Sequence, residues 1–99
     1  MRLTEHQQKV IRKATKDVFG SSATVRLFGS RVDDSLRGGD IDLLVECLEP
    51  IEDAGQMSAK LVAQIQTRLG DQKIDVICTW PGSKRLSVHR SAIETGIVL

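Results

Sequence analysis

The feature that most constrains the fold is the alternation of short apolar segments with longer stretches of helical periodicity. Three runs are rich in β-branched and apolar side chains, as is typical of strands: 24–28, 40–45 and 73–78. Two longer segments repeat apolar residues every three or four positions, as amphipathic helices do: 3–19 and 54–69. The remaining elements that we predict are short: a helical turn at 31–36, a last helix at 86–95 and a packed tail at 97–99.

The ends of the long helices carry recognisable signals. Thr4 and Gln7 have the spacing of a capping box, and Gly20 fits the end of the first helix. Gly70 closes the second helix in the same way. The expected core stripes are formed by residues one helical turn apart: Leu3, Gln7, Val10, Ile11, Ala14 and Val18, then Ala54, Met57, Leu61, Val62, Ile65 and Leu69.

The connections predict how the strands pair. The long helix between the second and third strands suits a right-handed crossover, which makes these two strands parallel if they are neighbours. The connection between the first two strands is short, so that pair can be antiparallel. We therefore expect an α/β (α+β) fold with a small mixed sheet of about three to four strands covered by helices. At 99 residues, the sequence predicts a single domain over 1–99.

Two acidic residues begin the second strand and alternate with apolar residues that we expect in the core. Asp40 and Asp42 are two positions apart and therefore point to the same face, and Asp75 has a similar apolar context in the third strand. Each acid alone could cap a strand or pair with a Lys or Arg. Three carboxylates on one face would instead repel one another, and a hard cation such as Mg²⁺ or Mn²⁺ would relieve that repulsion.

A Gly-Ser turn that could bind a phosphate group follows the first strand. Gly29 allows the backbone to approach a ligand, and a following helical turn offers N–H groups to a phosphate. Ser30 can add a hydroxyl. The alternative is purely structural, because a Gly-Ser pair often makes only a turn and Ser30 with Asp33 also fits a capping box.

Taken together, three motifs resemble the nucleotidyltransferase superfamily that includes DNA polymerase β. They are Leu27-Phe28-Gly29-Ser30, Asp40-Ile41-Asp42-Leu43 and the later Asp75. The resemblance implies a palm-like fold, a nucleoside triphosphate and two Mg²⁺ ions (Mn²⁺ being an alternative). It implies that Gly29 and Ser30 hold the triphosphate, that Asp40 and Asp42 bind metal, and that Asp75 completes the metal site and helps to deprotonate the acceptor hydroxyl. Arg31 follows Ser30 directly and is a further candidate for binding the triphosphate, with a pairing to Asp33 or Asp34 as the alternative.

The length of the chain is similar to that of the minimal nucleotidyltransferases, which commonly occur beside a helical HEPN-domain toxin. This likeness implies an antitoxin that transfers AMP from ATP to a Tyr of its partner. The chain itself contains no Tyr. Two other functions stay open: an antitoxin that binds its partner without catalysis, and a regulatory domain that binds nucleotide without turnover. The adjacent acids Asp33 and Asp34 favour the regulatory alternative.

Composition limits the other classes of function. The net charge of +1 and the aromatic content of 3% argue against direct nucleic-acid binding. No apolar run is long enough for a membrane span, and the first 20 residues do not resemble a signal peptide, so we expect a cytoplasmic protein. The sequence leaves the oligomeric state open.

Several residues have weaker signals. A basic cluster of Lys84, Arg85, His89 and Arg90 could meet a triphosphate or an acidic partner, but a solvated helix face is the simpler interpretation. We expect His6 and His89 at the surface, Trp80 packed at the end of the sheet, and Cys47 and Cys78 as buried thiols.

Overall fold

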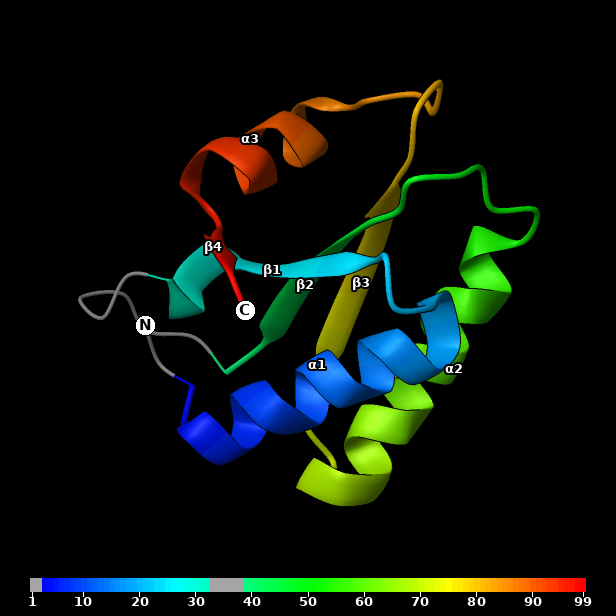
Figure 1. Ribbon diagram of the computed structural model, residues 1–99. Coiled ribbons are helices and arrows are strands. Elements are labelled where there is room, and N and C mark those ends of the chain that lie inside the picture. The colour runs from blue at the N-terminus through cyan, green and yellow to red at the C-terminus, as the bar shows by residue number, and fades with distance from the viewer. Residues whose placement is uncertain (1–2, 33–38) are drawn as a thin grey trace.

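The computed structural model describes residues 3–32 and 39–99 (Figure 1). It contains three helices, four strands and a 3₁₀ turn in the following order: α1 (Glu5–Phe19), β1 (Thr24–Phe28), the turn Gly29–Arg31, β2 (Ile41–Glu46), α2 (Ala54–Leu69), β3 (Ile74–Thr79), α3 (Ser87–Thr95) and β4 (Ile97–Val98). The predicted bounds of β1 and α2 are confirmed, and those of the other predicted strands and helices differ by one or two residues. Most of the helical turn predicted at 31–36 lies outside the described residues.

The sheet is mixed and has the strand order β3-β2-β1-β4. As the connections predict, β1 and β2 are antiparallel and β2 and β3 are parallel. The prediction of a packed tail is wrong for its first two residues. They form β4, which pairs antiparallel with β1, and their side chains remain 37% exposed at Ile97 and 53% exposed at Val98. A strand of two residues has too little sequence for an alternating pattern to reveal it.

The two faces of the sheet are covered differently. Figure 1 shows α1 and α2 on one side of the sheet and α3 on the other. The main core lies on the side of α1 and α2, where strand residues such as Leu27 and Leu43 pack with Ile11 and Ile65. On the other side, α3 contacts β1 and β2 and leaves one end of that face uncovered by a helix.

The helix ends follow local hydrogen bonding. Thr4 and Gln7 form the predicted capping box, in which each side chain accepts a bond from the other residue's backbone N–H. The prediction of a surface position for His89 is wrong, because His89 is 9% exposed and its Nδ1 accepts a hydrogen bond from the backbone N–H of Leu86 at 3.1 Å. This bond closes the first turn of α3 and turns the imidazole toward the protein.

The prediction that Cys47 and Cys78 are buried is only partly correct, since both thiols are half-buried. They lie near the carboxyl ends of β2 and β3 and pack against the margin of the main core. Burial is still sufficient to raise the pKa of both thiols, and a hydrogen bond with Ser58 acts in the opposite direction on Cys78.

In the described part of the chain, none of the helices combines the length and the apolar character that crossing a bilayer requires.

The main core predicts a clear effect of truncating a side chain in α2. Ile65 is 0% exposed, so Ile65→Ala should lower the free energy of unfolding by about 2–5 kcal/mol through lost burial and a cavity. The neighbouring Gln64 is exposed, and Gln64→Ala is the matched control, with an expected change of less than about 0.5 kcal/mol. Urea denaturation measures both values, and equal losses would contradict this assignment of the core.

Candidate functional site

The predicted acidic residues meet at one end of the sheet because of the strand register. Asp42 of β2 lies directly beside Asp75 of β3, and Phe28 at the end of β1 is the antiparallel partner of Asp42. Gly29 follows Phe28 at once. A single row across three strands therefore places both carboxylates beside the turn that the sequence singled out. We call this end of the sheet the acidic edge, defined by Gly29, Asp40, Asp42 and Asp75.

Alternation along β2 fixes the face on which the carboxylates lie. Ile41 and Leu43 are 0% exposed and belong to the main core, so the side chain of Asp42 between them points to the opposite face. Asp40 and Asp42 are half-buried and Asp75 is exposed. The core thus packs behind the acidic edge on one face of the sheet, and the carboxylates face solvent on the other.

The Gly-Ser turn touches this edge closely. Gly29 has a φ of +78°, which favours glycine, and a Cβ atom at this position would overlap Oδ2 of Asp42. Glycine is therefore required both by the backbone conformation and by the neighbouring carboxylate. Ser30 is half-buried in the same turn, and Nη2 of Arg31 donates a hydrogen bond to the backbone carbonyl of Gly39 at 2.9 Å. This bond joins the two ends of the segment between the turn and β2.

The acidic edge brings negative charges together, and a nearby lysine compensates them in part. Burial raises the pKa of Asp42 above its ordinary value, and the negative charges of Asp75 and Asp40 raise it further. Lys73 acts in the opposite direction. Protonation or a nearby cation would therefore stabilise the carboxylate of Asp42.

Lys73 is the residue at this edge that sequence reasoning missed. Its Nζ lies 3.4 Å from Oδ2 of Asp40, and its backbone carbonyl accepts a hydrogen bond from the N–H of Ile41 at 3.0 Å. Both charged side chains are substantially exposed, so the ion pair is easily broken. The signal was present in the sequence: Lys73 precedes Ile74 as Asp40 precedes Ile41, and the parallel register aligns the two pairs.

The donor chemistry of the edge fits a hard divalent cation, because its side-chain ligands are carboxylate oxygens. Their arrangement is only partly suitable. Within residues 3–32 and 39–99, no group of three or more His, Cys, Asp or Glu side chains is arranged so that it could hold a metal ion. The carboxylate of Asp40 is paired with Lys73, and it would have to turn away from that lysine to bind a metal ion together with Asp42 and Asp75.

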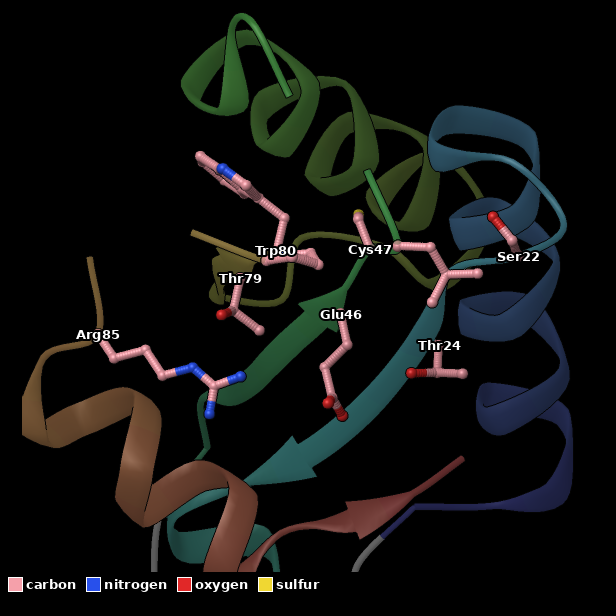
Figure 2. A pocket seen from close by; sticks show the side chains of 9 residues that line it. Ser22, Thr24, Glu46, Cys47, Thr79, Trp80 and Arg85 are labelled. Atoms are coloured by element: carbon pink, nitrogen blue, oxygen red, sulfur yellow. The ribbon is translucent and has the colours of Figure 1, made fainter. Parts of the chain in front are cut away.

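Other residues that the sequence singled out lie elsewhere. Trp80 and Arg85 line a pocket at the opposite ends of β2 and β3 from the acidic edge, together with Glu46 and Thr79 (Figure 2). Arg85 thus belongs to the lining of this pocket. His6 is exposed at the start of α1, as expected. Asp33 and Asp34 lie outside the described residues.

Comparison with known proteins adds no relative: no protein-family model and no curated protein matches this chain.

The contact between Gly29 and Asp42 predicts an unequal effect of two Gly→Ala substitutions. Gly20 also has a positive φ, of +97°, but no atom lies within 4 Å of where its Cβ would be. Gly20→Ala should cost about 1–2 kcal/mol through backbone strain alone. Gly29→Ala should cost roughly 1–3 kcal/mol more, because its methyl group must displace the Asp42 carboxylate. Denaturation of both variants measures the difference, and equal losses would show that the carboxylate moves aside freely.

The raised pKa of Asp42 predicts a pH-dependent effect of Asp42→Asn. In the wild type, protonated Asp42 stabilises the folded state, and this contribution is fully present below the ordinary Asp pKa of 3.8. It is lost as the pH rises through the raised pKa of the folded state, because the side chain then becomes charged. Asp42→Asn removes that loss. The variant should therefore be more stable than the wild type at neutral pH, by a small amount because solvent screens the charges, and this advantage should shrink in acid.

Urea denaturation across the acid-to-neutral range measures this effect. Asp71→Asn serves as the matched control, because Asp71 is exposed and lies outside the strands. An advantage of Asp42→Asn that does not change with pH would contradict the role given to the carboxylate charge.

Proposed function

We propose that this chain is a nucleotidyltransferase that uses the acidic edge as its active site. The observation that carries the proposal is the pairing of Asp42 with Asp75 in adjacent parallel strands, directly beside Gly29. Burial and the neighbouring negative charges both raise the pKa of Asp42, so the charged carboxylate lowers the stability of the fold. Such a destabilising cluster beside a glycine turn suggests a functional role. The sequence resemblance to the polymerase β superfamily agrees with the same residues.

In this proposal, an acceptor hydroxyl attacks the α-phosphorus of a nucleoside triphosphate, with ATP as the expected donor. The new bond joins the hydroxyl oxygen to phosphorus, the bond from the α-phosphorus to the bridging oxygen breaks, and pyrophosphate leaves. Asp75, which is exposed, accepts the proton of the hydroxyl. The backbone at Gly29 and the hydroxyl of Ser30 hold phosphate oxygens. Two Mg²⁺ ions, or Mn²⁺, held by Asp40, Asp42 and Asp75 would neutralise the charge of the triphosphate.

The acceptor is proposed to come from a second protein. The acidic edge is open to solvent at Asp75, and a reaction of this kind benefits from a surface that closes over the reacting groups and excludes water. A helical protein that presents a hydroxyl side chain would supply both the acceptor and the cover. By resemblance to the minimal nucleotidyltransferases, we propose a Tyr of a HEPN-type toxin, which makes this chain its antitoxin.

A second candidate function is binding without transfer, either of nucleotide or of the toxin. Two observations favour it: Asp40 is paired with Lys73, and among the described residues no three acidic, His or Cys side chains are grouped so that they could hold a metal ion. A protein that only covers its partner would tolerate this arrangement, because it needs no ion at the acidic edge.

An assay with ATP, Mg²⁺ and a candidate helical partner separates the two functions. The transferase should increase the mass of the partner by one or more AMP groups. Asp42→Asn and Asp75→Asn should each lower the rate at least about a hundredfold, since each removes a charge that the transition state requires. Asp71→Asn should retain the wild-type rate, because Asp71 lies outside the acidic edge.

Neutralisation of the partner by the wild type and by Asp42→Asn alike, without a mass change, would establish binding alone. A Mg²⁺ titration of the isolated chain followed by NMR provides a check without a partner. The amides near Asp40, Asp42 and Asp75 should shift together in the wild type and remain unchanged in Asp42→Asn.

A further inference from the structure

A pocket of about 360 Å³ opens at the carboxyl ends of the parallel strands β2 and β3, at the opposite end of these strands from the acidic edge. We call it the Trp80 pocket; Leu48, Thr79, Trp80, Pro81 and Arg85 are among the residues that line it. Ligands of open α/β sheets commonly bind just beyond the carboxyl ends of the strands. The volume lies within the range of ligand-binding clefts. The position and the size both fit a binding site.

The frame of this pocket is fixed by hydrogen bonds of one serine. Ser83 Oγ lies 3.2 Å from Oγ1 of Thr79 and accepts a bond from the backbone N–H of Trp80 at 3.1 Å. The backbone N–H of Ser83 in turn donates to the carbonyl of Trp80 at 3.0 Å. Thr79 is buried, so these hydrogen bonds attach the turn after β3 to the sheet. Figure 2 shows Trp80 held on the opposite side of the pocket from α3.

The charge available in the pocket is positive. Glu46 contributes a carboxylate, but the guanidinium of Arg26 binds it. Arg85 extends across the sheet toward Thr79 and Glu46 in Figure 2, and the adjacent Lys84 is exposed. Among the described residues, neither Lys84 nor Arg85 forms an ion pair or a side-chain hydrogen bond. An anionic group entering the pocket would therefore meet cations whose charge is not already neutralised.

The rim of the pocket is apolar as well as basic. Leu48, which lines it, is 69% exposed. Trp80 and Pro81 line the pocket as well and add apolar surface beside Leu48. These side chains would gain from being covered by an apolar group. A free phosphate or a nucleic-acid backbone could use the cations but would leave this apolar surface in water.

We propose that the Trp80 pocket binds an acidic segment of a partner protein that carries an apolar side chain. The apolar side chain of the partner contacts Leu48, Trp80 and Pro81, and a carboxylate beside it pairs with Arg85. This docking site goes beyond the proposed transfer chemistry and does not require it. Asp42 and Glu46 lie at opposite ends of β2, so that a docked segment leaves the acidic edge open.

Trp80 is the only tryptophan of the chain and therefore reports on its own pocket by fluorescence. The probe is a short synthetic peptide of alternating glutamate and leucine, without tryptophan or tyrosine, titrated into the intact protein. We expect a saturable change in Trp80 emission. Arg85→Glu and Leu48→Ser should each weaken binding about tenfold or more, since they remove the charge contact and the apolar contact respectively.

Matched controls separate docking from general charge effects. Arg68→Glu reverses a charge on the exposed face of α2 and should leave the affinity unchanged, as should Asp42→Asn at the acidic edge. A peptide in which lysine replaces glutamate should not bind. Circular dichroism melting establishes that Arg85→Glu and Leu48→Ser remain folded.

Four outcomes would overturn the proposal. The first is no response to the acidic peptide, and the second is an equal response to the lysine peptide. The third is an Arg85-dependent response to inorganic phosphate, ATP or a short RNA at comparable concentrations, which would identify a phosphate site. The fourth is an emission change with protein concentration alone, which would assign the pocket to a second copy of the chain.

Discussion

The parallel register of β2 with β3 is the constraint on which the acidic edge depends. Ile41 lies beside Ile74 and Leu43 beside Val76, so the apolar side chains of both strands meet on the face covered by α1 and α2. A shift by one residue would turn the carboxylate of Asp75 toward the core, where an unpaired charge is very costly. Hydrophobic burial thus selects the register, and the meeting of Asp42 with Asp75 on the other face is its consequence.

Local patterns were sufficient to predict most of this architecture. The stripe that includes Leu61 and Ile65 runs along the whole of α2 and ends at a glycine, so both its length and its bounds could be predicted. The same holds for the capping box at Thr4. Strand directions followed from connection length, because a long helical crossover permits parallel pairing. For the acidic edge, alternation in β2 was enough to place Asp40 and Asp42 on one face.

The features that sequence reasoning missed depend on neighbours that are distant along the chain. The edge strand Ile97–Val98 exists because β1 offers it backbone partners, and its own side chains carry no pattern. His89 is buried because its ring turns back onto the backbone of Leu86. The pairing of Lys73 with Asp40 required the register of two strands to be known, although each residue was visible beside an apolar neighbour. Propensity and periodicity describe single segments and do not report such pairings.

The crossover through α2 also has a consequence for the order of folding. β1 and β2 pair across a short connection, whereas β3 reaches β2 only after the whole of residues 47–73 has been closed into a loop and a helix. Loop-closure entropy delays this last pairing, so we expect β3 to dock late. The repulsion between Asp42 and Asp75 then arises only when most apolar surface is already buried. It therefore acts mainly on the rate at which β3 detaches, and any cation that settles between the two carboxylates would slow that step.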